Sequence, residues 1–65
     1  MNKKFLARLM SYIDHLNNKI EMFYEHYGDE YDRYTEEEKI KIISLESEIS
    51  TVKWIRDMYL ELSNN

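Results

Sequence analysis

Apolar residues recur at alternating intervals of three and four along the first half of the chain, and this spacing constrains the fold more than any other feature. The run comprises Leu6, Leu9, Ile13, Leu16, Ile20, Phe23 and Tyr27. Such spacing keeps the apolar side chains on one side of a helix, because three and four residues bracket one helical turn. We therefore expect a helix over residues 3–27. It should end at Gly28, the single glycine in a chain without proline, where a left-handed cap fits.

The second half opens with the pattern of a capping box. Thr35 precedes Glu38 by three residues, so that each side chain can bond the backbone amide of the other. The same spacing of three and four then resumes, with one interval of three where four is due, at Ile42, Leu45, Ile49, Val52, Ile55, Tyr59 and Leu62. We expect a turn over 28–35, a second helix over 36–62 and a frayed tail over 63–65. The predicted fold is all-α: one domain of 65 residues, folded as a two-helix antiparallel hairpin.

A second apolar stripe lies on the second helix, beside the first and distinct from it. It contains Ile40, Ser47, Thr51, Trp54 and Met58, with Ile43 at its edge. One hairpin covers only one stripe on each helix, and an exposed apolar patch usually marks an interface. The favoured prediction is a homodimer in which two hairpins form a four-helix bundle through this stripe. The alternatives are that the stripe serves a different protein, or that Trp54 lies flat over a monomeric hairpin.

Residues 28–38 carry the whole acidic excess of the chain. They hold one arginine and six acidic side chains, a charge of −5, within a total formal charge of −4. Both helices are therefore nearly neutral and lack the basic face that binding to nucleic acid requires. The stretch is either a solvated turn or an acidic, aromatic tip that docks on a basic surface of a larger protein. In the second interpretation, the candidate partner-binding residues are Asp29, Glu30, Tyr31, Asp32 and Tyr34.

We predict no catalytic residue, metal site or cofactor. A calcium loop starting at Asp29 would place Tyr31 and Arg33 where oxygen ligands are needed. His15 and His26 fall outside the apolar spacing and lack a glutamate three residues before them, so we expect solvated side chains. Without cysteine or a glycine-flanked serine, the chain offers no activated nucleophile. No apolar run approaches the roughly 20 residues of a membrane span, and we expect a cytoplasmic protein without membrane contact.

One tract carries a family resemblance. The tract is Ile13-Asp14-His15-Leu16-Asn17-Asn18-Lys19-Ile20, followed by Phe23 and Gly28. It resembles the first helix of the small sporulation-type aspartyl-phosphate phosphatases, helical hairpins that remove phosphate from response regulators. Their second helix carries a Ser-Gln-Glu-Leu-Asp signature, and the nearest match here is Glu46-Ser47-Glu48-Ile49-Ser50. Glu48 and Ile49 agree in character with that signature, and Ser50 replaces its closing acid.

The leading hypothesis for function is a small acidic interaction module without enzymatic activity. It would bind and modulate or inhibit a larger protein, as bacterial and phage accessory regulators do. The resemblance implies an alternative, a phosphatase-like regulator of a response regulator. A third hypothesis is a purely structural segment of a bundle.

Overall fold

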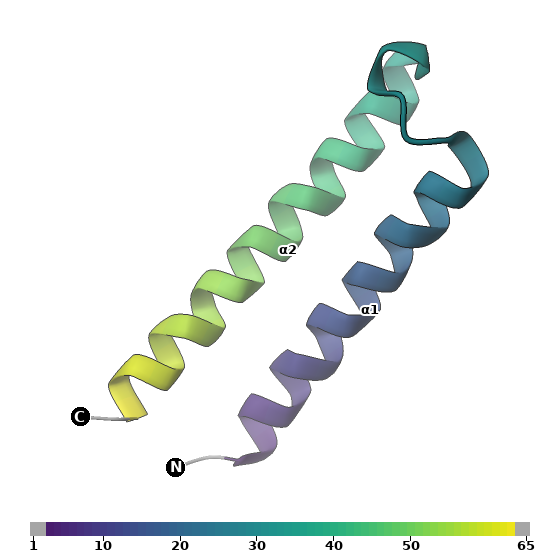
Figure 1. The fold of residues 1–65 in the computed structure, drawn as a ribbon. Coiled ribbons are helices and arrows are strands. Elements are labelled where there is room, and N and C mark those ends of the chain that lie inside the picture. The colour runs from purple at the N-terminus through teal and green to yellow at the C-terminus, as the bar shows by residue number, and fades with distance from the viewer. Residues whose placement is uncertain (1–2, 64–65) are drawn as a thin grey trace.

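The structure is a computed structural model that describes residues 3–63. Helix α1 spans Lys3–Tyr27, a single turn of 3-10 helix, η1, spans Tyr31–Arg33, and helix α2 spans Glu36–Ser63. The two long helices lie side by side and run in opposite directions, so that the start of α1 and the end of α2 lie at the same end of the molecule (Figure 1). This confirms the predicted all-α antiparallel hairpin. Of the predicted frayed tail, Ser63 closes α2, and residues 64–65 lie outside the described residues.

The core is a single layer of side chains between the two helices. One cluster of buried residues contains Ile13 and Leu16 from α1 with Ile49 and Val52 from α2. A second cluster nearer the turn contains Phe23, Tyr34 and Ile42. The molecule measures 46 × 15 × 14 Å, so it has no deeper interior to compensate for a defect in this layer. Burial of these few side chains therefore provides most of the stabilisation of the hairpin.

Two hydrogen bonds between tyrosine and glutamate link the helices on opposite sides of this core layer. The Tyr12 hydroxyl donates to the Glu48 carboxylate on one side. The Tyr24 hydroxyl donates to Glu46 Oε1 at 2.7 Å on the other. In each case the bond to the carboxylate raises the pKa of the phenol, to about 12 for Tyr24. Both phenols therefore keep their protons at neutral pH and continue to donate.

The C-terminal half of α2 differs from the sequence prediction. The predicted shift of the spacing would bring Ile55 and Leu62 inward, but these side chains are 37% and 68% exposed. The regular spacing continues instead, and the partly buried residues after Val52 are Arg56, Tyr59 and Ser63. The packing of Val52 against α1 fixes the rotation of α2 about its axis. Ile55 could then face inward only if the helix were overwound between Val52 and Ile55. The Arg56 guanidinium leaves the core layer and pairs with Asp57 at 3.0 Å, so only its aliphatic part packs inward.

Over residues 3–63, neither helix combines the length and the apolar character needed to cross a membrane.

Candidate interaction surfaces

The turn is held by local bonds at both of its ends. Gly28 adopts φ +82°, and its N–H donates to the Tyr24 carbonyl at 2.8 Å. This is the left-handed end of a helix that glycine permits. At the other end, the Thr35 N–H donates to Glu38 Oε1 at 2.8 Å, and the Glu38 N–H donates to Thr35 Oγ1 at 3.2 Å. The predicted capping box is therefore formed, and neither cap involves the acidic residues that lie between them.

Tyr34 is buried in the structure, whereas the prediction that it contacts a partner requires an exposed side chain. Its side chain is 6% exposed and packs edge-on against Phe23, with ring centroids 5.2 Å apart. Its hydroxyl donates to the Gly28 carbonyl and so ties the two ends of the turn together. Burial raises the pKa of Tyr34, which keeps the hydroxyl protonated. A ring that closes the end of the core offers no contact area to a partner, so Tyr34 does not belong to the binding set.

The other four candidate residues of the turn are exposed. We call Asp29, Glu30 and Asp32 the acidic tip. Glu30 Oε2 lies 2.8 Å from Arg33 Nε, but both side chains are solvated, so this pair contributes little to stability. The Tyr31 ring packs edge-on against the Tyr34 ring, with ring centroids 5.9 Å apart, and much of the Tyr31 ring remains exposed to solvent.

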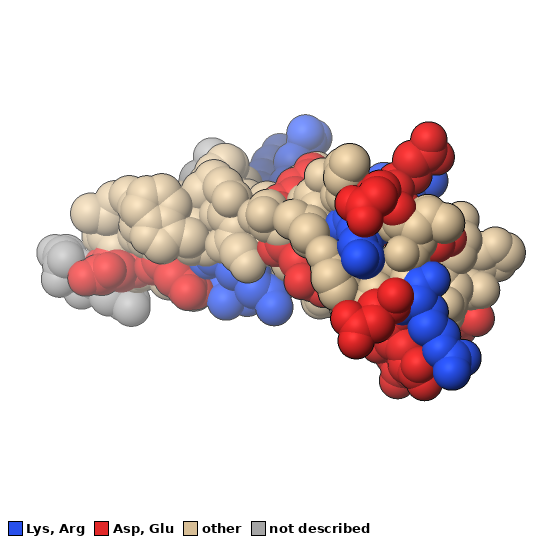
Figure 2. Space-filling model, turned by 90° about the horizontal axis from the view of Figure 1, so that it is seen from above, with Lys and Arg blue, Asp and Glu red and all other residues tan. Residues whose placement is uncertain are grey.

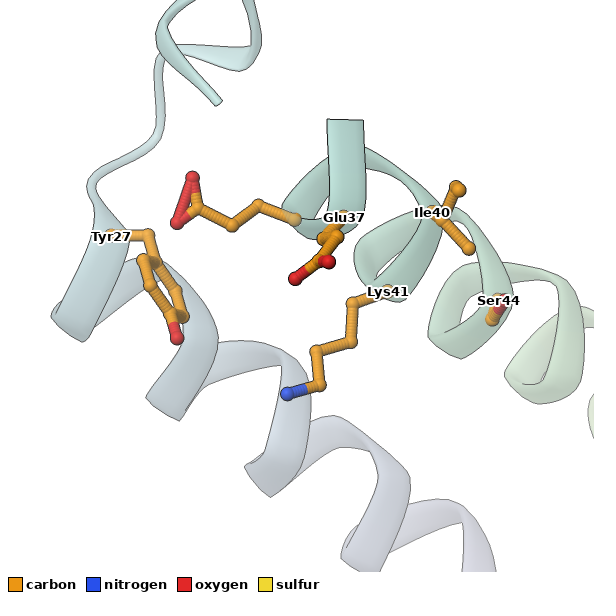
Figure 3. Close-up of a pocket in the computed structure, with 6 residues that line it drawn as sticks. Tyr27, Glu37, Ile40, Lys41 and Ser44 are labelled. Carbon is orange, nitrogen blue, oxygen red and sulfur yellow. The ribbon is translucent and has the colours of Figure 1, made fainter. Parts of the chain in front are cut away.

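Helix α2 exposes apolar side chains on the side away from α1. All five residues of the predicted second stripe are exposed, including Ile40 at 65% and Trp54 at 63%. At about 100° per residue, they lie opposite the buried side of α2, not beside it as the sequence had indicated. In Figure 3, Ile40 lies on the side of α2 away from α1, while Lys41 reaches toward α1. We define the outer face of α2 as Ile40, Ile43, Ser47, Thr51, Trp54 and Met58.

Figure 2 views the hairpin from above, from the side on which α2 lies in Figure 1. A band of uncharged side chains runs along this view. Charged side chains lie at its edges and gather at the right of the view, at the end that carries the turn. The apolar and the acidic surfaces therefore occupy different parts of the molecule, and each is open to a different contact.

Two open hollows lie between the helices near the turn. One, of about 400 Å³, is lined by Tyr27 of α1 and by residues at the start of α2, including Glu37, Lys41 and Ser44, with Ile40 of the outer face at its rim (Figure 3). The other, of about 360 Å³, adjoins it and also contains Tyr27 and Lys41. Both hollows are shallow and open to solvent, so neither encloses a ligand. His26, which lines the second hollow, and His15 are exposed, as expected.

The described part of the chain has no group of three or more histidine, cysteine, aspartate or glutamate side chains placed to hold a metal ion.

In comparisons with family models, curated proteins and solved structures, nothing matches this chain. The resemblance to the aspartyl-phosphate phosphatases therefore extends only to the helical hairpin itself.

Proposed function

We propose that this chain is a small protein–protein interaction module that works as a homodimer and binds a larger protein. The outer face of α2 carries the proposal. It is apolar, it is exposed, and no other part of the described hairpin covers it. Burying a large apolar side chain contributes roughly 1.5–3 kcal/mol, so Ile40, Trp54 and Met58, each present in two copies, can offset the entropic cost of pairing.

Pairing through this face sets the order of the helices in the dimer. Because the outer face lies opposite the buried side of α2, the two α2 helices form the centre and each α1 lies outside. The four-helix assembly is then a layer with three successive contacts. In a bundle around one shared core, the second stripe would instead lie beside the buried side of α2, so that both helices of each hairpin could reach the common core.

The acidic tip and Tyr31 are the proposed contacts with the larger protein. They lie at the end of the hairpin, clear of the outer face, so both surfaces can be occupied at once. Their charge suits a surface rich in lysine and arginine, and such charge mainly speeds association. An exposed tyrosine beside the carboxylates adds contact area at a low cost in side-chain entropy.

The molecular mass in solution tests the dimer. We expect sedimentation equilibrium to give about 16 kDa, twice the 8.0 kDa of one chain. Trp54→Glu should return the mass to 8.0 kDa, because pairing would bury an unpaired carboxylate. Met22→Glu is the matched control, since Met22 is 66% exposed, similar to Trp54, and lies on α1. A parent chain that remains at 8.0 kDa at high concentration would contradict the homodimer.

The phosphatase-like alternative has one structural feature in its favour. Glu48, the acid that agrees with the family signature, is an exposed residue of α2. It already accepts a hydrogen bond from Tyr12, which reduces its availability to a substrate. Release of phosphate from a phosphorylated response regulator on addition of this protein would support the alternative over the interaction module.

A further inference from the structure

The arrangement of charges beside the outer face specifies how two copies pair. This inference rests on the proposed homodimer and adds its direction and register. We infer that the two α2 helices pack antiparallel about a two-fold axis near Ser50, with Glu46 of each copy beside Lys53 of the other.

A line of charged residues runs along one edge of the outer face. Ile40, Ser47 and Trp54 are seven residues apart and lie in line on α2, and Lys39, Glu46 and Lys53 each precede one of them by one residue. The two lines therefore run side by side along the helix. In a symmetric antiparallel pair, this charged edge of one copy lies along the same edge of the other copy.

The order of signs along this edge is self-complementary. Glu46 lies four residues before Ser50, and Lys53 lies three residues after it. An axis near Ser50 therefore places Glu46 and Lys53 of different copies within about 1.5 Å of the same level along the helix, and does so twice. Lys39 and Asp57 of the second copy lie farther apart along the helix, about 6 Å from the same level, and this distance is within reach of a lysine side chain. Opposite charges at such flanking positions select the direction and register of paired helices.

The apolar residues agree with the same axis. Ile43 lies seven residues before Ser50 and Trp54 lies four after it, so the two come within about 4–5 Å of the same level in opposite copies. Ile43 is 49% exposed and offers an apolar surface for the indole ring. Near the axis itself the outer face presents Ser47 and Thr51, which are small enough to let the two helix backbones approach closely.

Lys53 is the residue best placed to make the new contact. Within residues 3–63 Lys53 makes no ion pair. Its proposed acceptor, Glu46, already accepts a hydrogen bond from the Tyr24 hydroxyl of its own chain. A carboxylate can accept several hydrogen bonds, so Glu46 can keep Tyr24 and receive Lys53 of the second copy.

A parallel pair would have two disadvantages. It would place the two turns side by side, each with the charge of −5 of residues 28–38, and these would repel. It would also place the charged edges of the two copies on opposite sides of the pair, so that no Glu46–Lys53 pair would form. The antiparallel pair separates the two acidic tips by roughly 50 Å, at opposite ends of the dimer. The dimer then presents two equivalent sites, suited to a partner that is itself two-fold symmetric or that has repeated basic segments.

Charge reversal tests the register. Glu46→Lys and Lys53→Glu each replace two attractive pairs by two repulsive ones, so each variant alone should raise the Kd of dimerisation about tenfold or more. Mixing the two variants creates heterodimers in which both contacts are again Lys against Glu. We expect an affinity-tagged Glu46→Lys chain to recover the Lys53→Glu chain in preference to another copy of itself. Tyr24→Phe is the control for the loss of the bond within the chain, and it should leave the Kd unchanged.

The direction is tested by single cysteines, because the natural chain has none. Under oxidising conditions, Ser50→Cys should link two copies efficiently and Met58→Cys should not, since residues 58 lie roughly 24 Å apart along an antiparallel pair. Equal linking by both variants would indicate a parallel pair and overturn the inference. A parent that dimerises but shows no preference for the mixed variants would overturn the register alone. A parent that stays monomeric would instead refute the proposed homodimer.

Discussion

Replacing Tyr34 tests whether the turn is part of the core or part of a binding surface. Tyr34 is buried against Phe23 and Ile42, and its hydroxyl donates to the Gly28 carbonyl. We compare Tyr34→Ala, which removes the ring, with Tyr34→Phe, which removes only the hydroxyl. Tyr31→Ala is the matched control, because Tyr31 occupies the same turn and is 45% exposed.

The three substitutions should lower the free energy of unfolding by different amounts. Removing a buried aromatic ring costs about 3–5 kcal/mol, and we expect about 3 kcal/mol for Tyr34→Ala because water can reach the end of the hairpin. A chain of this size has a total stability of roughly 3–10 kcal/mol, so this loss takes a large part of it or all of it. Tyr34→Phe should cost about 0.5–1 kcal/mol, because water can replace the hydroxyl at the exposed Gly28 carbonyl. Tyr31→Ala should cost less than about 0.5 kcal/mol, as surface substitutions usually do.

Urea unfolding followed by circular dichroism measures these differences. All variants are compared at one protein concentration, because the stability of a dimer depends on concentration. The expected order of unfolding midpoints is parent, Tyr31→Ala, Tyr34→Phe and, far below them, Tyr34→Ala. Equal midpoints for Tyr34→Ala and Tyr31→Ala would refute the placement of the Tyr34 ring in the core.

Three further predictions concern the cap, the tip and a tyrosine pKa. Thr35→Ala should cost about 1 kcal/mol in the same unfolding assay through loss of the capping box, and an unchanged midpoint would contradict this role. Changing the three residues of the acidic tip to asparagine should leave the helical spectrum intact and slow association with a basic partner, most strongly at low salt. Unchanged binding at low salt would reduce the tip to a solvated connection. Because the bond to Glu46 raises the pKa of Tyr24 from 10.0 to about 12, the stabilisation from this bond is complete below pH 10 and lost as pH rises toward 12. An alkaline titration followed by tyrosine absorbance should therefore lose its highest-pH component in Tyr24→Phe.

The local features of this fold could be predicted from the sequence because they depend on neighbouring residues. The capping box needs only Thr35 and Glu38, and the end of α1 needs only a residue that tolerates positive φ, which Gly28 supplies. The apolar spacing around Ile13 and Leu16 likewise identifies the buried side of α1. Each of these interactions spans no more than a few turns of helix, so the sequence alone contains the information.

Other features depended on how the helices pack. Sequence alone could not show that Tyr34 closes the core, because its contacts with Phe23 come from the other side of the turn. Nor could it show that Arg56 faces inward in preference to Ile55. A helix rotates about its axis as a rigid unit. The packing of Ile49 and Val52 therefore decides which later residues point toward α1, whether those residues are apolar or charged. The same rotation places Trp54 on the side away from α1. The sequence by itself determined that a second apolar stripe exists and that one hairpin leaves it uncovered, but only the packing of Ile49 and Val52 against α1 decided that the stripe lies opposite the buried side of α2.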